Sequence, residues 1–371
     1  MPRRVLPFHS LPPWLLRRLV PSVLLWLLVA SDAACRPGPA APPVPTASAV
    51  PGNAPTRTAN PTATAATTAP APTALSTAAS PIRMAFSPST DTAKVLLHGG
   101  QVARLLEGQT RLKFQISVPI SYAALVEALN ANQVDVAWLT AASYVYARNR
   151  YGVDLLLTTT RNGSKTYPFA LQARAGSPIT SVLDLKGKDF AFVDRLSTSG
   201  NLYPRAYMLK NGLDPDRDLR VTYLGSHDNV VIAVYNGQVD AGATYGEFKG
   251  VPDAREAVKK LLPDVMEKVR PFYTSDAIIP NDTVSARKGL PADLKKKVQE
   301  GLTAIAKTEE GLKELKALYN IDGLVVGDPK DYDPIEAAAR SANIDLGESF
   351  VPSLPAATAI PALRTPTANA P

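Results

Sequence analysis

The chain contains an internal repeat, called the echo, in which two segments have the same order of residue types. Residues 121–135 begin with Ser121, continue as an apolar helical run and end in Gln-Val-Asp. Residues 226–240 follow the same plan at a constant offset of 105 positions (226 − 121 and 240 − 135), and each Gln-Val-Asp leads into an apolar strand. Two copies of so long a unit are too few for a solenoid. The echo therefore predicts two related lobes, each with its own sheet.

The echo belongs to a longer alternation of strands and helices between residues 83 and about 346. Strands are predicted at 82–86, 112–118, 134–139, 154–158, 169–173, 189–193, 220–224, 239–244 and 283–287. Helices are predicted at 92–106, 122–130, 142–150, 199–211, 228–235 and 292–307. This order indicates an α/β fold with mainly parallel sheets flanked by helices.

The folded part should comprise residues 83–350 and divide into two lobes joined by hinges. We expect lobe one at about 83–171 and 280–350, and lobe two at about 172–279. The chain would then cross between the lobes near Gln172 and Asp282. Closure of two such lobes is a hinge motion.

The first 34 residues are typical of an export signal. Four arginines, Arg3, Arg4, Arg17 and Arg18, precede a short apolar core at 19–30. A twelve-residue helix spans about 18 Å, which is short of the ~30 Å hydrocarbon core of a bilayer. The pattern therefore favours a cleaved signal peptide over a membrane-spanning helix.

Cys35 is the only cysteine, and it directly follows two alanines. A single cysteine excludes an internal disulfide. Its position resembles a bacterial lipobox, in which the cysteine is lipidated and becomes the mature N-terminus, although Asp32 stands where an aliphatic residue is usual. The alternative is an incidental cysteine beside an ordinary signal-peptidase site. The lipobox interpretation predicts an extracytoplasmic protein that is held at a membrane through Cys35.

Pro, Ala and Thr dominate residues 35–82 and again residues 351–371. Such a composition cannot bury enough apolar surface to offset the entropy of ordering the chain. We therefore predict a disordered tether before the folded part and a disordered tail after it. A tether of this kind suits a protein that works at some distance from a membrane anchor.

Charge and composition argue against nucleic-acid binding and against a metal or cofactor site. The net charge is +7, of which the signal segment supplies +3 (four Arg minus Asp32). The lysines cluster in predicted helices rather than among aromatic residues, which does not indicate nucleic-acid binding. The three histidines and the single cysteine show no metal-ligand spacing, so no metal or other cofactor is expected. The basic balance mildly favours anionic ligands.

A run of hydroxyl side chains, Ser197-Thr198-Ser199-Gly200, lies between an apolar strand and a helical run. Free N–H groups and the positive dipole end of a helix start can hold an oxyanion, and hydroxyls add donors. The alternative is an ordinary N-cap, where Ser and Thr are also preferred. The echo supports the anion site, because it places Tyr122 and His227 at equivalent helix starts that two facing lobes would bring to one cleft.

Further motifs occur in a fixed order along residues 83–338. They are Ser121-Tyr122-Ala123, Gln133-Val134-Asp135-Val136-Ala137-Trp138, Ser143-Tyr144-Val145, Asp184-Leu185-Lys186-Gly187-Lys188, Phe192-Val193-Asp194, Ser197-Thr198-Ser199-Gly200, Gly225-Ser226-His227-Asp228, Asn236-Gly237-Gln238-Val239-Asp240 and Ile279-Pro280-Asn281-Asp282. In this order they resemble the phosphate/phosphite/phosphonate-binding proteins of ABC transporters, the PhnD-like group of type II periplasmic binding proteins. The resemblance implies a two-lobed fold with a small tetrahedral anion in the cleft.

The resemblance also implies ligand contacts at eight positions: Tyr122, Tyr167, Ser197, Thr198, Ser199, His227, Glu247 and Asp282. The serines and Thr198 would receive the oxyanion at a helix start, and the two tyrosines and His227 would donate to it. In aminoalkylphosphonate binders the two acids meet the ligand's ammonium group. A carboxylate close to an oxyanion repels it unless a cation or proton intervenes, so Glu247 and Asp282 predict a ligand with a positive or protonated group.

The implied function is that of a lipid-anchored solute-binding protein, expected as a monomer, that delivers a phosphorus oxyanion to an ABC permease. Two alternatives remain at this point. One is an oxyanion-sensing subunit that docks on a membrane kinase. The other is an extracytoplasmic phosphoester hydrolase, for which Ser199 and His227 would be nucleophile and base. No metal set and no Ser-His-acid spacing supports the hydrolase, so an enzyme is not expected.

Overall fold

The structure is a computed structural model in which residues 80–347 are described. The predicted signal segment 1–34, Cys35, almost all of the tether 35–82 and the tail 351–371 lie outside the described residues. Within them, strand β1 (Ile82–Phe86) begins one residue before the predicted start of the folded domain. No helix of the described part is long and apolar enough to cross a membrane.

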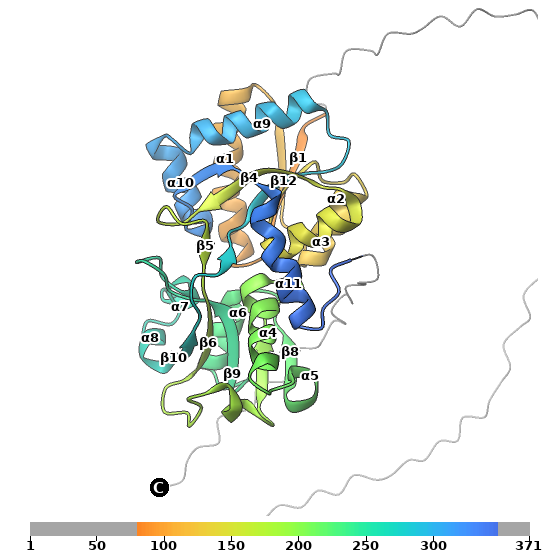
Figure 1. Cartoon of the computed structure of the whole chain (residues 1–371). Coiled ribbons are helices and arrows are strands. Elements are labelled where there is room, and N and C mark those ends of the chain that lie inside the picture. Colours follow the sequence, from red (N-terminus) through yellow and green to blue (C-terminus); the bar gives the residue numbers. More distant parts are fainter. Residues whose placement is uncertain (1–79, 348–371) are drawn as a thin grey trace, which may run out of the picture. The chain divides into compact units, whose positions relative to one another are not determined.

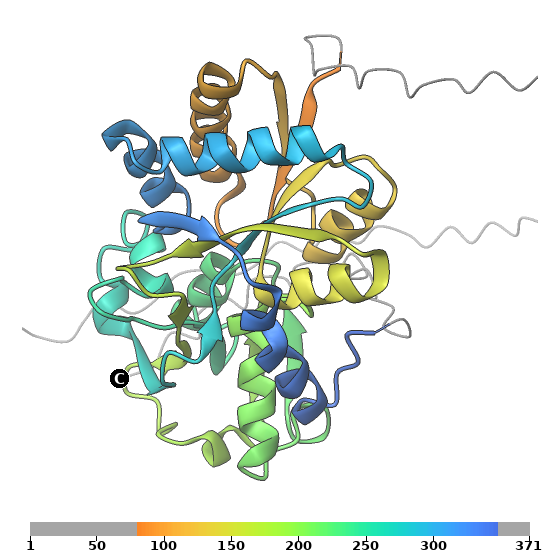
Figure 2. The ribbon, with the colours of Figure 1, turned by 45° about the horizontal axis from the view of Figure 1, so that its top comes forward.

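Lobe one is built on a six-stranded sheet in the order β13-β4-β12-β3-β1-β2. The remaining strands are β2 (Phe114–Ser117), β3 (Val136–Leu139), β4 (Asp154–Thr160), β12 (Thr283–Ala286) and β13 (Gly323–Val326). One face buries apolar residues of α1 (Thr92–Thr110), α9 (Ala292–Ile305) and α10 (Glu309–Tyr319). The other face is covered by α2 (Tyr122–Asn130) and α3 (Ala141–Tyr151). Figure 2 shows α9, in light blue, running across the strands of this sheet.

Lobe two has a five-stranded sheet in the order β10-β6-β9-β7-β8. The strands are β6 (Phe169–Arg174), β7 (Asp189–Phe192), β8 (Arg220–Tyr223), β9 (Ala241–Tyr245) and β10 (Val269–Thr274). Its helices are α4 (Tyr203–Lys210), α5 (Pro215–Asp218), α6 (His227–Tyr235), α7 (Ala254–Val258) and α8 (Val265–Lys268). A 3-10 turn, η1 (Val182–Leu185), precedes β7. Figure 1 shows the two lobes one above the other, with β5 between them and β6 in the lower lobe.

Both sheets are mixed, so the expectation of mainly parallel sheets is wrong. In lobe one only β1–β2 and β1–β3 pair parallel, while β12 runs antiparallel to both β3 and β4. In lobe two β7 pairs parallel with β8 and β9, but β6 is antiparallel to β9 and β10. The reason lies in the crossings: β12 and β6 enter their sheets from the other lobe and therefore run against their neighbours. The α/β architecture with two sheets is confirmed.

The chain crosses between the lobes through two short strands, β5 (Thr166–Tyr167) and β11 (Ile279–Pro280). They pair antiparallel, with Tyr167 opposite Ile279. The second crossing lies beside Asp282, as predicted. The first comes earlier than expected, because Gln172 lies inside β6, buried in the sheet of lobe two.

The echo has a structural basis in both lobes. Ser121 and Ser226 are the N-caps of α2 and α6, and each hydroxyl accepts a hydrogen bond from the third residue onward. The acid of each Gln-Val-Asp ties its strand to the first strand of the parallel pair. Asp135 accepts from the backbone N–H of Arg83 at 2.9 Å, and Asp240 accepts from the N–H of Asp189 at 3.0 Å. The repeated residues therefore build the same strand–helix–strand unit twice.

The last described helix, α11 (Asp333–Ser341), follows a 3-10 turn, η3 (Pro329–Tyr332). It packs against both α3 of lobe one and α4 of lobe two. Glu336 accepts hydrogen bonds from Arg148 and Asn149 of α3. This helix therefore does not belong to lobe one alone, as residues 280–350 were expected to.

Candidate functional site

A cavity of about 80 Å³ lies between the lobes. This is several times the ~10–15 Å³ that one water requires, so the space suits a small ligand. Four of the predicted contacts line it: Tyr167, Ser199, His227 and Asp282. Its other polar lining residues are Ser87, Ser89, Thr90, Lys94, Thr140, Arg161, Tyr245, Tyr319 and Asn320.

The hydroxyl run divides into three roles. Ser197 is the N-cap of a π-helical turn, η2 (Thr198–Leu202), and its Oγ accepts from the N–H of Gly200 at 3.1 Å. Thr198 is fully buried and its Oγ1 accepts from the N–H of Ala142 in lobe one at 3.0 Å. Ser199 alone of the three lines the cavity. Ser197 thus has the N-cap role, and Ser199 is the residue of the motif that reaches the cavity.

His227 begins α6 and reaches the cavity from lobe two. The residue is 4% exposed, and its Nδ1 has no hydrogen-bond partner among the described residues. Burial, with a smaller contribution from the charge of Arg161, lowers the pKa of His227 to about 3. The imidazole is therefore neutral near pH 7 and offers one N–H donor.

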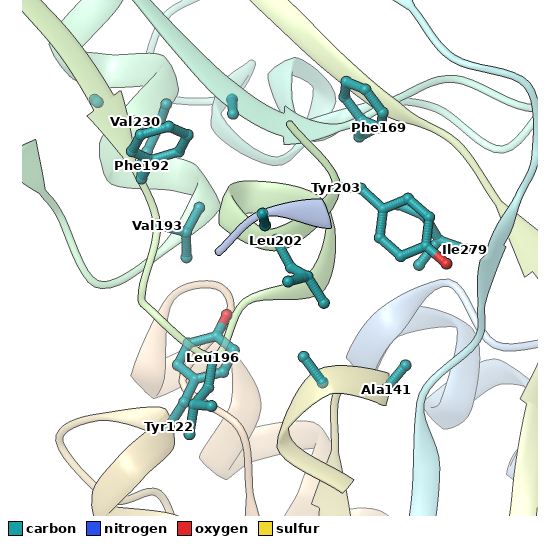
Figure 3. Packing of buried hydrophobic residues seen from close by; sticks show 14 of the residues in the cluster. Tyr122, Ala141, Phe169, Phe192, Val193, Leu196, Leu202, Tyr203, Val230 and Ile279 are labelled. Carbon is teal, nitrogen blue, oxygen red and sulfur yellow. The ribbon is translucent and has the colours of Figure 1, made fainter. Parts of the chain in front are cut away.

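Tyr122 is fully buried beside the cavity and is not among its lining residues. Figure 3 shows it among the buried side chains at the junction of the lobes, in the same cluster as Leu196 of lobe two. Its hydroxyl has no partner among the described residues. Burial, and then the charge of Asp194, raises the pKa of Tyr122 well above its usual value, so the phenol stays a donor. Buried polar atoms are nearly always hydrogen-bonded, which makes this hydroxyl an exception.

Tyr167 belongs to the crossing strand β5 and lines the cavity. Its hydroxyl lies 3.5 Å from Ser199 Oγ, the long limit of a hydrogen bond. Burial raises the pKa of Tyr167, so it too remains a protonated donor. The Arg161 guanidinium lies 5.4 Å from the centre of its ring, within cation–π range.

Arg161 and Asp282 form an ion pair at the cavity wall, with Arg161 Nη2 and Asp282 Oδ2 2.7 Å apart. Arg161 follows β4 and Asp282 follows β11, so the pair joins the two crossing segments. The guanidinium also donates to the side chain of Asn281 at 2.8 Å and to the carbonyl of Tyr319 at 3.0 Å. These bonds fix the position of the charge.

Glu247 is exposed and does not line the cavity. It follows Gly246, which does line the cavity, but Glu247 itself is not among the lining residues. Of the two acids predicted to contact the ligand, the structure therefore brings only Asp282 to the site.

The lobes also contact each other directly around the cavity. On one side, the N–H of His227 donates to the Ser89 carbonyl at 3.0 Å, and Asp228 Oδ2 accepts from Thr90 Oγ1 at 2.8 Å. On the other side, Thr140 Oγ1 donates to the Leu196 carbonyl at 2.9 Å. The structure is therefore a closed arrangement of the two lobes.

Sequence reasoning missed Arg161 and the serines and threonine that precede α1. Arg161 carried one signal, a basic residue directly after a predicted buried strand. Its partner Asp282 is more than a hundred residues away, so only the crossing topology brings them together. Over residues 80–347 no group of three or more His, Cys, Asp or Glu could hold a metal ion.

Comparison with known proteins identifies the family. The model of the family described as "ABC transporter, phosphonate, periplasmic substrate-binding protein" matches residues 84–332. The chain belongs to this family. The family consists of periplasmic transport proteins, so this binding protein acts outside the cytoplasm.

Two curated relatives support the assignment. The phosphate-import protein PhnD of Mycolicibacterium smegmatis is 27% identical, with 53% of this chain and 72% of that protein covered. The phosphonates-binding periplasmic protein of Escherichia coli is 29% identical, with 51% of this chain and 55% of that protein covered. The binding protein thus matches only about half the length of the second relative.

Two solved structures share the fold. A binding protein component of an ABC phosphonate transporter from Pseudomonas aeruginosa has a TM-score of 0.64 and 23% identity, covering 71% of this chain and 86% of its own. PhnD1 of Prochlorococcus marinus in complex with methylphosphonate has a TM-score of 0.62 and 19% identity, covering 71% and 98%. The type II periplasmic binding-protein fold is therefore confirmed.

Proposed function

We propose that this binding protein captures a small phosphorus oxyanion between its lobes and delivers it to an ABC permease. Phosphonate, phosphite and phosphate share the tetrahedral head that the cavity would hold. The observation that carries the proposal is that two of the buried polar atoms without a partner among the described residues, the Tyr122 hydroxyl and His227 Nδ1, belong to predicted ligand contacts. Two such groups, one in each lobe, are accounted for if a ligand between the lobes completes their hydrogen bonds.

The donor set suits an oxyanion. Ser199 and Tyr167 supply hydroxyls at the cavity, and His227 supplies a neutral imidazole. Ser197 and Thr198 would act through the helix start that they shape, since its first N–H groups have no intrahelical acceptor. Hydrogen bonds to a charged oxygen are the stronger kind, so a few neutral donors suffice to hold the anion.

Attachment to a membrane would come from Cys35. Lipidation there, followed by the Pro/Ala/Thr tether, would hold a monomeric binding domain near its permease. Cys35→Ser should then release the protein from the membrane fraction and abolish labelling by a radioactive fatty acid. Unchanged fractionation and labelling would contradict the lipid anchor without touching the ligand proposal.

A thermal-shift screen of phosphite, phosphate, methylphosphonate and sulfate tests the ligand class. A phosphorus oxyanion at 100 times its Kd should stabilise the protein by about 2.7 kcal/mol, with calorimetry to measure affinity. Ser199→Ala should weaken binding at least tenfold, whereas Ser341→Ala, on an exposed turn of α11, should leave it unchanged. No stabilisation by any phosphorus oxyanion would contradict the proposal, and release of product from a phosphate ester would favour a hydrolase.

A further inference from the structure

The carboxylate of Asp282 already has a cation of this chain as its partner. Its Oδ2 lies 2.7 Å from Arg161, and the two side chains are only 21% and 12% exposed, so the pair is poorly screened by water. Arg161 cannot lose its charge in a protein. A ligand ammonium approaching Asp282 would therefore meet a neutralised carboxylate and, beside it, a fixed positive charge.

Among residues 80–347, no second acid lines the cavity. The charged lining residues are Lys94, Arg161 and Asp282, two cations and one anion. Glu247 is exposed and lies outside the lining. Asp228 is buried outside the lining; its Oδ2 accepts from Thr90 Oγ1 and from the N–H of Asp91, while its Oδ1 has no partner among the described residues. Within the described residues the cavity lining thus has a net positive charge, and its one carboxylate is paired with Arg161.

Part of the wall is apolar. Trp138, Leu139, Phe248, Val251 and Leu318 line the same cavity as the ion pair. These apolar side chains accept hydrogen or a short alkyl group at little cost, whereas an ammonium placed against them would lack a hydrogen-bond acceptor there, which is expensive.

Arg161 also has donors to spare. Of its five N–H groups, three make the bonds to Tyr319, Asn281 and Asp282. The bonds hold the guanidinium rigidly on the cavity wall, so little conformational entropy is lost when a remaining N–H donates to an anionic oxygen.

We propose that Arg161, by pairing with Asp282, makes the site selective for phosphorus oxyanions whose fourth substituent is uncharged, and excludes aminoalkylphosphonates. Phosphite and methylphosphonate belong to the accepted class, and 2-aminoethylphosphonate belongs to the excluded one. The proposal rests on the proposed function and names its ligand class. It reverses the expectation that Asp282 receives a ligand ammonium.

Calorimetry on the full-length protein with methylphosphonate and 2-aminoethylphosphonate tests this selectivity. We expect the wild type to bind methylphosphonate at least tenfold more tightly. Arg161→Gln removes the cation and frees Asp282, so it should shift the ratio of the two dissociation constants at least tenfold toward the amino compound. Arg220→Gln is the matched control, because Arg220 pairs with Asp189 on an exposed surface away from the cavity; it should keep the wild-type ratio.

Each outcome has a definite meaning. If the wild type binds 2-aminoethylphosphonate as tightly as methylphosphonate or more tightly, the selectivity proposal is overturned while oxyanion binding stands. This comparison needs no variant, so it holds even if Arg161→Gln fails to fold. An unchanged ratio in folded Arg161→Gln overturns the role of Arg161. A wild type that binds neither compound, nor phosphite or phosphate, overturns the proposed function and the selectivity with it.

Discussion

At Tyr122, the effect on protein stability and the effect on ligand binding should have opposite signs. Its buried hydroxyl has no partner in the part of the chain that the structure describes, so Tyr122→Phe should raise the free energy of unfolding of the ligand-free protein by about 1 kcal/mol. The same variant should bind phosphite more weakly. Tyr332→Phe is the matched control: its buried hydroxyl lies 3.0 Å from the Asn281 carbonyl, so the change should destabilise by about 1 kcal/mol in denaturant titrations. Equal destabilisation in both variants would refute the assignment.

His227 should make the protein sensitive to acid. The unfolded chain binds a proton near pH 6.5, whereas burial keeps the folded histidine neutral down to about pH 3. The unfolded state therefore binds more protons in this window, and stability falls as pH drops below 6.5. Between pH 7 and pH 5 this residue should account for a loss of about 2 kcal/mol.

The measurement is the free energy of unfolding of the wild type and His227→Gln at both pH values. The variant should lose about 2 kcal/mol less on acidification. An identical loss in the two proteins would show that His227 is accessible to protons in the folded state.

Among helices and strands, the sequence predicted best those elements with a clear hydrophobic pattern and well-marked ends. The predictions for β1 and for α2 match the structure residue for residue. Two missed strands, β10 and β13, lie at sheet edges. β10 contains Pro271 and a register irregularity next to it, features that edge strands tolerate and that break the alternating pattern. The hydrophobic pattern of β10 therefore reflects this irregularity and does not alternate as in a regular strand.

The site residues likewise fall into those that a local pattern predicts and those that it does not. Ser199 and His227 could be placed because helix starts are local features with N-cap signals. The resemblance supplied Tyr167 and Asp282. The exposure of Glu247 and the pairing of Arg161 with Asp282 depend on how distant segments meet at the crossing, which no local pattern encodes.

Close packing under η2 makes Gly200 irreplaceable. A Cβ built there would lie 2.3 Å from Val193 Cγ2 and 2.8 Å from Ser197 Oγ. Gly200→Ala should therefore cost about 1–3 kcal/mol of stability and disturb the helix start. Gly108→Ala is the control on α1, where nothing lies within 4 Å of the new methyl; it should stabilise by about 0.4–1 kcal/mol. Thermal unfolding of both variants checks the pair, and equal effects would contradict the packing argument.

At the scale of the whole molecule, the bonds between the lobes set the balance of open and closed states. Thr198→Val keeps the side-chain shape but leaves the N–H of Ala142 unpaired when the lobes meet. The closed state should lose about 1–3 kcal/mol relative to the open one. Small-angle scattering should then give a larger radius of gyration without ligand, reduced again by saturating phosphite. Thr303→Val, on α9 of lobe one, should match the wild type; an unchanged radius in Thr198→Val would contradict the prediction.

The two crossing strands are hydrogen-bonded to each other, Tyr167 opposite Ile279 and Thr166 opposite Pro280. Sliding one strand past the other would break this register, whereas bending both together preserves it. The ion pair of Arg161 with Asp282 adds a second tie between the same segments. The pairing therefore favours bending of both strands together over sliding of one past the other. The lobes should open and close along a single reproducible arc, which returns every donor of the cleft to the same place in each cycle.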